Sequence, residues 1–520
     1  MTWMTLGDIL RVNAKKYPDK IAVKDEVRSL TFKELNERAC RLANAMRNLG
    51  LRQGDRVAVL LYNNVEYMEI YAACAKAGII CATINFRFIG PEVKFIVEDS
   101  GSRMLFVGSD FLKLSDEVKP ELPHVQYIVQ VDGVPCEGYL CYETLIEEAP
   151  PRGPHLGVDP KSPWLLLYTS GTTGQPKGVV RTHESYIAFF LINEVEFAFK
   201  HDDVGLIVMP MFHVNSTFYS FVFTYIGATV YIHRAHQFDP EEILQIIDRE
   251  GITFTSLVPT HYTMMLSLPD DVKAKYDLGS IRSLLCSSAP VRKETKMGIM
   301  EMFPDVQLFE AYGSTEAGLV TTLRPEDQMK KLGSIGRECV GSDNIQLLND
   351  RGEEVAVGKV GEIWSRSPMM FDRYWAMPDK TRDCKRLDGY FSAGDMGKRD
   401  EEGYFYIVDR KDNMIITGGE HVYPNEVEAV IASHPKVEDV AIVGLPDEKW
   451  GEAVHAVVIL KPGQRMRERT IIDHCKGKMA GYKKPKGVSF IQRDEMPRTA
   501  TGKIRHRILR RQMRKQLGMK

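Results

Sequence analysis

The segment Tyr168–Val179, YTSGTTGQPKGV, carries the residue types that can hold a polyphosphate. Eight of its twelve residues are Gly, Ser, Thr or Lys. Glycines let backbone N–H groups approach an anion closely, hydroxyls donate hydrogen bonds, and Lys177 adds a positive charge. The segment is not a Walker loop, because Pro176-Lys177-Gly178 stands where that motif needs Gly-Lys-Ser/Thr. Taken alone, it also fits a flexible surface loop.

Four charged residues downstream suit the chemistry of a bound nucleotide. Glu316 is the sole acid in a turn of small residues and suits Mg²⁺ held against phosphates. Asp395 can accept hydrogen bonds from both ribose hydroxyls, and Arg410 can donate to them. Lys503 can bring an ammonium group to a carboxylate that attacks a phosphate, a step otherwise opposed by anion repulsion. Each of these residues alone also fits a surface position or a surface ion pair.

Together these segments resemble the signatures of the adenylate-forming superfamily, in the family's order. This superfamily comprises acyl-CoA synthetases, aryl-CoA ligases, firefly-type luciferases and peptide-synthetase adenylation domains. The resemblance implies an α/β fold: a large N-terminal domain of two covered β-sheets with a small β-barrel-like subdomain, followed by a small mobile α+β domain. The matching segments are Tyr168–Val179, Ala311–Glu316, Gly389–Asp395, Asp409–Asp412, Gly418–Glu428 and Pro497–Ile504.

The resemblance also implies where ATP and AMP bind. Tyr312 would stack on adenine, Thr315 would contact the α-phosphate, and Glu316 would be the Mg²⁺ ligand. The chain departs from the family at Ala393, where Thr is usual, and at Ser287, where many members have Gly. The implied nucleotide contacts are Thr169, Ser170, Gly171, Thr172, Thr173, Gly174, Lys177, Ser288, Ala289, Pro290, Ala311, Tyr312, Gly313, Thr315, Asp395, Ile407 and Arg410.

Two half-reactions follow from the same resemblance. Lys503 would be the catalytic lysine of adenylation, and rotation about Asp412 would exchange it for a thioester-forming surface. Gly418, Gly419 and Glu420 would border the pantetheine arm of CoA. We therefore expect an N-terminal domain over 1–409, a hinge over 410–412 and a lid domain over 413–520.

The acid is defined less sharply than the nucleotide. His213 would border the acyl pocket and gate the carboxylate, and it argues against an amino-acid substrate, for which relatives place an Asp nearby. Most candidate pocket residues are apolar, which favours an aliphatic or cyclic acid. Asn215 hints at a polar substituent, a feature with some likeness to carnitine/crotonobetaine-CoA ligases. The pocket candidates are His213, Val214, Asn215, Tyr219, Leu285, Ala317 and Val320.

The predicted enzyme is an AMP-forming acid:CoA ligase that uses ATP, CoA and Mg²⁺. The closest likeness is to fatty or medium-chain acyl-CoA ligases. A module that charges a carrier protein and a luciferase-like oxygenase are the alternatives. Lys503 is also a hypothetical acetylation target, because acetylation would remove its charge. A homodimer is compatible with the sequence.

Helices that alternate with short apolar strands must position these residues. Leu35, Ala39, Leu42, Ala43 and Met46 share a helix face, and Val57–Leu61 follows as a strand. The alternation predicts mostly parallel sheets that are covered on both faces. After Gly333, shorter strands with tight turns predict an antiparallel or barrel-like unit. The other expected strands are Ile79–Ile84, Arg103–Val107, Val204–Met209, Thr229–Ile232, Phe254–Val258, Leu284–Cys286, Asn344–Leu348, Glu362–Ser365, Gly403–Val408, Val437–Gly444 and Ala453–Leu460, and the other expected helices Asn64–Ala77, Pro91–Ser100, Asn425–Ser433 and Glu468–Met479.

Composition narrows the class of protein further. With 68 basic and 70 acidic residues, the chain gives no reason to expect nucleic acid as a partner. Its nine cysteines lack CxxC spacing, which predicts reduced thiols in a cytoplasmic protein. The most apolar stretch, Phe218–Ile232, is short for a membrane span and is interrupted by polar residues, so no integral membrane segment is expected.

Overall fold

The computed structural model describes residues 4–154, 156–170, 176–234, 236–289, 291–498, 502 and 504–519. Its internal contacts divide the chain into two compact units. The first unit comprises Met1–Asn344 and Ser365–Phe391, and the second comprises Ile345–Trp364 and Ser392–Lys520. The expected domain limits at 409 and 413 were drawn along the linear sequence and remain a prediction.

The first unit contains the two predicted sheets, each mainly parallel. Sheet A runs β16-β15-β14-β13-β12-β10-β11-β1-β2, and sheet B runs β19-β9-β8-β4-β3-β5-β6-β7. Sheet A consists of β1 (Ile21–Lys24), β2 (Ser29–Thr31), β10 (Val204–Ile207), β11 (Thr229–Ile232), β12 (Phe254–Leu257), β13 (Ser283–Ser287), β14 (Gln307–Ser314), β15 (Gly318–Leu323) and β16 (Arg337–Glu338); sheet B consists of β3 (Arg56–Leu60), β4 (Ile80–Thr83), β5 (Met104–Val107), β6 (Tyr127–Gln130), β7 (Leu140–Cys141), β8 (Pro163–Ser170), β9 (Pro176–Thr182) and β19 (Arg373–Tyr374).

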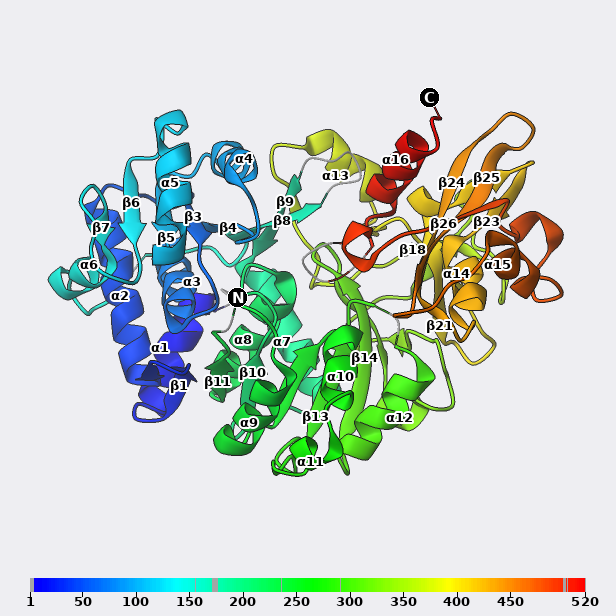
Figure 1. Cartoon of the computed structure of the whole chain (residues 1–520). Coiled ribbons are helices and arrows are strands. Elements are labelled where there is room, and N and C mark those ends of the chain that lie inside the picture. Colours follow the sequence, from blue (N-terminus) through cyan, green and yellow to red (C-terminus); the bar gives the residue numbers. More distant parts are fainter. Residues whose placement is uncertain are drawn as a thin grey trace. The chain divides into compact units, whose positions relative to one another are not determined.

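Helices cover both faces of each sheet, because alternate strand residues point to opposite sides. In β13, Leu284 packs into the cluster beneath the outer helices of sheet A, whereas Leu285 packs into the central core. That central core joins the inner faces of both sheets. The outer helices are α9 (Pro240–Glu250), α10 (Pro259–Leu266), α11 (Asp270–Lys273) and α12 (Lys293–Met302) on sheet A, and α4 (Gly90–Ser100) and α5 (Leu112–Val118) on sheet B; the inner ones are α1 (Leu6–Lys16), α2 (Phe32–Asn48), α3 (Val65–Ala77), α7 (His183–Phe197) and α8 (Val214–Ile226) (Figure 1).

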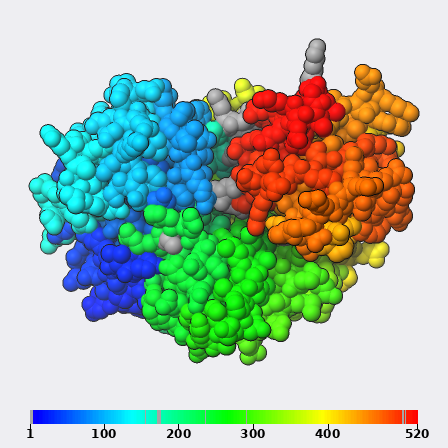
Figure 2. Space-filling view, viewed as in Figure 1, coloured from blue at the N-terminus to red at the C-terminus, as the bar shows by residue number. Residues whose placement is uncertain are grey.

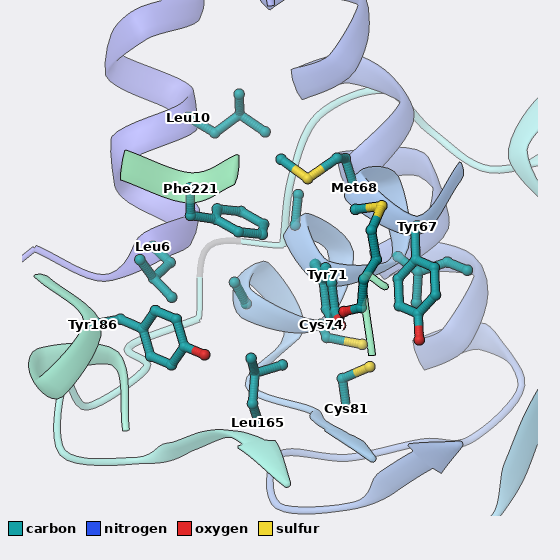
Figure 3. Close-up of a cluster of buried hydrophobic side chains, with 14 of the residues drawn as sticks. Leu6, Leu10, Tyr67, Met68, Tyr71, Cys74, Cys81, Leu165, Tyr186 and Phe221 are labelled. Carbon is teal, nitrogen blue, oxygen red and sulfur yellow. Dashed lines mark hydrogen bonds between the residues drawn. The ribbon is translucent and has the colours of Figure 1, made fainter. Parts of the chain in front are cut away.

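Large aromatic side chains fill the central core. Tyr71 of α3, Tyr186 of α7 and Phe221 of α8 converge with Leu165 of β8 (Figure 3). Trp164 Nε1 donates a hydrogen bond to the Tyr71 carbonyl at 3.0 Å, so the buried indole is satisfied. On the surface of this unit, the part of the chain that forms sheet B (light blue in Figure 2) adjoins the part that forms sheet A (green). Two short helices, α6 (Tyr142–Glu148) and α13 (Pro378–Cys384), complete the unit.

The second unit holds two smaller sheets. One is antiparallel, as predicted, in the order β17-β18-β20-β21; the other has the order β23-β22-β25-β24, with β26 paired to β25. Helix α15 (Glu468–His474) ends before the predicted Met479, because Gly477 adopts φ 73° and such left-handed residues end helices. The remaining elements are β17 (Gln346–Leu348), β18 (Gly361–Trp364), β20 (Asp395–Arg399), β21 (Phe405–Arg410), β22 (Ile415–Thr417), β23 (Glu420–Val422), β24 (Val437–Asp447), β25 (Gly451–Leu460), β26 (Gly487–Phe490), α14 (Pro424–Ala432) and α16 (His506–Gln516).

Across the described residues, no helix is long and apolar enough to cross a membrane. The apolar stretch Phe218–Ile232 divides into the end of α8, a left-handed Gly227 and strand β11, as the sequence indicates.

Candidate active site

The predicted phosphate segment is the connection of an antiparallel pair, β8 and β9. Thr169 lies opposite Lys177, and Ser170 lies opposite Pro176. Both ends of the segment are therefore strands and not a flexible loop, while the predicted contacts Gly171, Thr172, Thr173 and Gly174 lie outside the described residues. A Cβ on Gly178 would come within 2.8 Å of Leu166 and 3.1 Å of Trp375, so a larger residue would require these side chains to shift.

A chain of hydrogen bonds connects Lys177 to Glu316. Lys177 Nζ donates to the Tyr374 hydroxyl at 3.2 Å, and that hydroxyl donates to Glu316 Oε1 at 2.8 Å. Burial and the neighbouring Glu316 carboxylate raise the pKa of Tyr374, so the phenol keeps the proton that it donates. Burial also raises the pKa of the adjacent Cys384 thiol to about 11. Two predicted phosphate-site residues are thus brought together by one that the motifs did not include.

Tyr374 belongs to β19, which pairs with β9 in sheet B. Its signal in the sequence is weak, because β19 spans only Arg373–Tyr374 and two residues show no periodicity. The aromatic pair Tyr374-Trp375, directly before the helix that begins at Pro378, is the feature that could have indicated it.

Glu316 and Thr169 carry oxygen groups that can bind Mg²⁺ and a phosphate. The Glu316 side chain is largely buried and supplies carboxylate oxygen, the donor that Mg²⁺ prefers. Thr169 Oγ1 is enclosed yet has no hydrogen-bond partner among the described groups. A buried hydroxyl without a partner is costly, and a phosphate oxygen would satisfy it.

Arg181 of β9 connects the β8–β9 hairpin, which contains the predicted phosphate segment, to the turn that ends at Glu316. Its guanidinium is fully buried and donates to the carbonyls of Thr315 and Met369, at 2.7 Å each. It also lies over the rings of Tyr186 and Phe218. Burial lowers the pKa of Arg181 to about 10, which leaves it charged at neutral pH. The sequence motifs gave no indication of this residue.

The predicted adenine residues lie on adjacent strands. Ser287, the last residue of β13, is opposite Ala311 of β14, so Ser288 and Ala289 emerge beside Tyr312. Ser288 adopts φ 72°, a strained conformation that is frequent at binding sites. Pro290 lies outside the described residues. A Cβ on Gly313 would come 2.1 Å from the Gly318 carbonyl oxygen, which explains the glycine in this hairpin.

The acyl-pocket candidates lie at the start of α8 and along sheet A. His213 is the N-cap of α8 and accepts a hydrogen bond from the Asn215 backbone at 3.3 Å. The Asn215 side-chain amide donates to the hydroxyls of Ser256 (2.7 Å) and Ser287 (3.3 Å). The Asn215 amide, on which the prediction of a polar substituent in the acid rests, is therefore hydrogen-bonded to two hydroxyls of the protein.

The apolar candidates border an aromatic region of the central core. Val214, Tyr219 and Leu285 all belong to this core. The Tyr219 ring packs against Phe189, Phe197 and Phe254, and burial raises the pKa of its phenol. Ala317 and Val320 are also buried, on the turn and strand that follow Glu316.

The predicted ribose residues face each other across two strands of the second unit. Asp395 of β20 pairs with Arg410 of β21, and Arg410 Nε lies 3.0 Å from Asp395 Oδ1. Ile407 lies on β21, opposite Gly397. The buried Asp409 accepts hydrogen bonds from the backbones of Arg410 and Asn425, and so fixes the end of the strand. The predicted hinge residue Asp412 follows in the short turn Lys411–Asn413 and is exposed.

Described residues on either side of Lys503 contact one another, whereas residues 499–501 and Lys503 itself lie outside the described residues. At its base Arg505 N donates to the Pro497 carbonyl at 2.8 Å, and Arg498 bridges to Ile504. The Arg498 guanidinium also donates to the Gly502 carbonyl and pairs with Asp439. These contacts hold Arg498 close to Gly502, Ile504 and Asp439.

Gly418 and Gly419 occupy the tight turn between β22 and β23. Their φ angles are 59° and 83°, as a two-residue hairpin turn with two left-handed positions requires. A Cβ on Gly418 would come 2.7 Å from the Trp450 ring. The geometry of the turn therefore explains why glycines stand at these two positions. Glu420 begins the strand that follows.

Comparison with known proteins identifies the class. The family model described as AMP-binding enzyme matches residues 10–375, and that of the AMP-binding enzyme C-terminal domain matches residues 426–503. The chain belongs to this family. The predicted adenylate-forming fold and the predicted class, ATP-dependent acyl-CoA synthetase, are confirmed.

Individual relatives cover the whole length of the chain. It is 35% identical to the indoleacetate–CoA ligase of Aromatoleum aromaticum, over 96% of this chain and 97% of that protein. It is 34% identical to a fatty acid–[acyl-carrier-protein] ligase of Streptomyces coeruleorubidus, over 97% and 96%. A solved anthranilate CoA ligase in complex with anthranoyl-AMP superposes with a TM-score of 0.90 at 30% identity, covering 100% of this chain and 98% of that chain.

Proposed function

We propose that the chain is an acid:CoA ligase whose acid has an apolar body, preferably with a planar aromatic ring. A carboxylate oxygen attacks the α-phosphorus of ATP, and pyrophosphate leaves. The CoA thiolate then attacks the acyl carbon, and AMP leaves. The observation that carries the ATP chemistry of this proposal is the Lys177–Tyr374–Glu316 chain of hydrogen bonds beside the β8–β9 hairpin.

We assign the steps of the first half-reaction to the following groups. Lys177 and the enclosed Thr169 hydroxyl bind the phosphates that leave as pyrophosphate. Glu316 would hold Mg²⁺, which neutralises phosphate charge when bound. Tyr312, Ser288 and Ala289 contact adenine, while Asp395 and Arg410 bind the ribose.

Lys503 is the proposed catalytic lysine. An ammonium group brought to the reacting carboxylate offsets the repulsion between two anions as the bond to phosphorus forms. The contacts of Arg498 with Gly502 and Ile504, on either side of the lysine in the sequence, support this role.

Two observations support an apolar, ring-bearing acid. The pocket candidates Tyr219 and Leu285 adjoin an aromatic part of the core, where planar rings pack favourably. Relatives at 35% and 30% identity are named for indoleacetate and anthranilate. A fatty acyl chain is the alternative, and the 34% identical relative of Streptomyces is named for a fatty acid.

CoA is the proposed acceptor, with Gly418, Gly419 and Glu420 beside its pantetheine arm. Carrier-protein loading is the alternative, because one relative is named for that acceptor. We keep the cytoplasm as the proposed location, since all nine cysteines are free thiols.

The test is a substrate panel read by pyrophosphate release. Indole-3-acetate, ferulate, anthranilate and phenylacetate are compared with hexanoate, dodecanoate, palmitate and crotonobetaine, each at saturating MgATP. We expect kcat/KM to be highest for a ring-bearing acid and AMP release to require CoA. A preference for palmitate would contradict the proposal of a ring-bearing acid. Acyl transfer only to a carrier protein would contradict the proposal that CoA is the acceptor.

A further inference from the structure

Three side chains of the first unit converge away from the nucleotide residues. Glu26 lies in the turn between β1 and β2, His233 directly follows β11, and Glu242 lies in the first turn of α9. One ligand atom from each lies within 4.8 Å of the other two. Strands β1 and β11 are parallel neighbours with Lys24 opposite Tyr231, so two residues further along Glu26 and His233 reach the same edge of the sheet.

His233 is a buried base with one ring nitrogen, Nε2, that makes no hydrogen bond to the described groups. It is 2% exposed, and its Nε2 has no hydrogen-bond partner among the described groups. The same nitrogen lies 3.2 Å from Glu242 Oε2, without the geometry of a hydrogen bond. Leaving a buried imidazole nitrogen unsatisfied is costly. A metal ion would use its lone pair.

The separation between these two atoms matches that of two metal ligands. Zinc–nitrogen and zinc–oxygen bonds of about 2.0–2.1 Å place neighbouring ligands of a tetrahedron roughly 3.3 Å apart. One imidazole and two carboxylates form a donor set that zinc accepts, with a fourth position for water. Mg²⁺ prefers oxygen donors alone, so this site differs in kind from the one proposed at Glu316.

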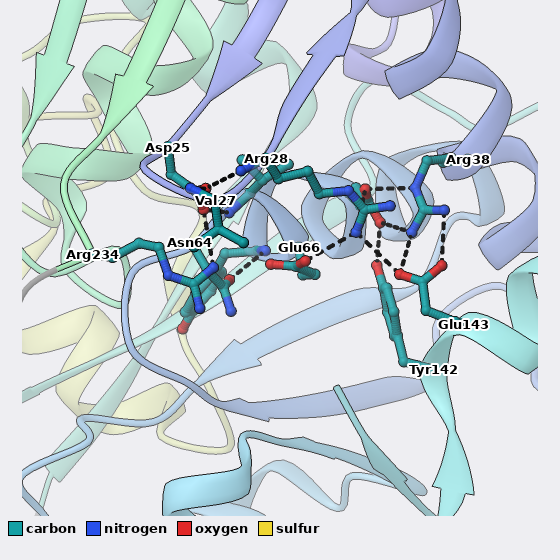
Figure 4. A network of polar contacts seen from close by, with 12 residues as sticks. Asp25, Val27, Arg28, Arg38, Asn64, Glu66, Tyr142, Glu143 and Arg234 are labelled. Atoms are coloured by element: carbon teal, nitrogen blue, oxygen red, sulfur yellow. Dashed lines mark hydrogen bonds and ion pairs between the residues drawn. The ribbon is translucent and has the colours of Figure 1, made fainter. Parts of the chain in front are cut away.

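Hydrogen bonds of Asp25 hold the chain next to two of the proposed ligands, Glu26 and His233 (Figure 4). Asp25 Oδ1 accepts from the backbones of Val27 and Arg28, at 2.8 Å each, and so fixes the turn that carries Glu26. Asp25 Oδ2 accepts from Val65 N and from Arg234, the neighbour of His233, at 3.2 Å each. Asp25 also balances the charge of Arg234, which would otherwise oppose a cation.

We propose that Glu26, His233 and Glu242 form a divalent-cation site for which Zn²⁺ is the best-fitting ion. Bound there, the ion links the N-terminal β1–β2 turn, strand β11 and helix α9. The site stands independently of the acid and of the acceptor proposed above.

The test uses the full-length protein after removal of metal with EDTA. Titration with ZnCl₂, followed by calorimetry and thermal unfolding, should give one tight equivalent and a higher Tm. Glu26→Gln and Glu242→Gln should each weaken binding by at least tenfold. Titration with CoCl₂ should produce visible absorption bands that His233→Gln removes.

Glu241→Gln is the matched control, because Glu241 lies on the same helix but accepts a hydrogen bond from Tyr276. It should bind Zn²⁺ like the wild type. MgATP-dependent pyrophosphate release in every variant reports that the fold is kept. The proposal is overturned if the wild type binds no stoichiometric Zn²⁺, or if Glu26→Gln and Glu242→Gln leave the affinity unchanged. Since both carboxylates are partly exposed, these variants decide the matter even if His233→Gln fails to fold.

Discussion

At the scale of single residues, the phenol of Tyr374 connects Lys177 to Glu316 through two hydrogen bonds. Hydrogen bonds to charged groups contribute about 1.5–3 kcal/mol each, more than neutral ones. A side chain that holds both the ammonium and the carboxylate keeps these opposite charges apart and ready for phosphate and metal.

Removing the Tyr374 hydroxyl tests this arrangement. We expect Tyr374→Phe to lower kcat/KM for MgATP by about tenfold or more, since the loss of even one of its two hydrogen bonds to charged groups corresponds to about that factor. Pyrophosphate release measures the effect. The matched control is Tyr276→Phe, which removes a phenol bonded to Glu241 on the outer side of sheet A and should leave activity unchanged. Equal rates for Tyr374→Phe and wild type would exclude the phenol from the site.

The sequence indicates the role of a residue where a recognisable motif contains it. It gives no such indication where the role arises from contacts made only in the folded chain. Lys177, Glu316, Asp395 and Arg410 are predicted as site residues because charged residues stand among glycines and small residues at recognisable spacings. Tyr374 and Arg181 were missed because their roles arise from side chains that meet across more than a hundred residues of chain. The partners of Asn215, Ser256 and Ser287, could not be predicted, because they become its neighbours only when the sheet forms.

At the scale of elements, Arg181 joins strand β9 to the turn that ends at Glu316. We expect Arg181→Met to leave the carbonyls of Thr315 and Met369 without donors, at about 1–3 kcal/mol each. A lower Tm and a higher KM for ATP should appear together, because the same contact positions the phosphate hairpin. Arg181→Lys, which keeps the charge and one donor group, should recover part of both. Wild-type Tm and KM in Arg181→Met would contradict the role.

Helices α14 and α16 are joined by a hydrogen bond between His506 Nε2 and Glu428 Oε1, 3.0 Å apart. Burial alone would lower the pKa of His506, but the hydrogen bond and the charge of Glu428 outweigh it and raise the pKa above 6.5. A raised pKa means that the protonated form is stabilised by folding. This contribution is complete below the unfolded pKa and is lost as the pH rises through the folded pKa.

We therefore expect the Tm of the wild type to fall with rising pH, beginning above about pH 6.5. The His506→Gln variant should lack this part of the decline. Thermal unfolding at pH 6, 7, 8 and 9 measures it, with His201→Gln as a control at a largely exposed histidine. Parallel pH curves for wild type and His506→Gln would rule out the link between the helices.

Element types followed from the sequence more closely than element limits did. Strand β11 has the predicted bounds Thr229–Ile232, because apolar β-branched residues are enclosed there by Gly227 and a polar segment. Helix α15 was predicted too long, since periodicity continues past the point where Gly477 turns the chain. Strand β19 was not foreseen at all, because a two-residue strand exists only through its pairing with β9.

At the scale of the whole molecule, the two half-reactions should respond differently to two substitutions. Lys503→Ala should slow adenylation by about two to three orders of magnitude, as expected for one lost preorganised charge. It should largely spare thioester formation from supplied acyl-AMP. Separate assays of the two half-reactions measure this difference. Equal loss of both rates would contradict the proposal that Lys503 acts only in adenylation.

Asp412→Pro should have the opposite effect. Proline fixes φ, so the proposed hinge could no longer move freely between two conformations. We expect CoA-dependent turnover to fall while at least one half-reaction survives at a near-normal rate. Unchanged turnover would show that Asp412 is not the pivot.

The distribution of the nine free thiols offers a direct way to observe such motion. Cys136, in the first unit, is exposed, whereas the other eight are buried or half-buried. A hydrogen bond from Thr144 lowers the pKa of the half-buried Cys141, so Ser would replace it to prevent a competing reaction. A fluorescent maleimide would then mark Cys136. A second cysteine at the exposed Lys461 would carry the acceptor dye. Energy transfer recorded from single molecules, as ATP, acid and CoA are added in turn, would count the conformations of the working enzyme.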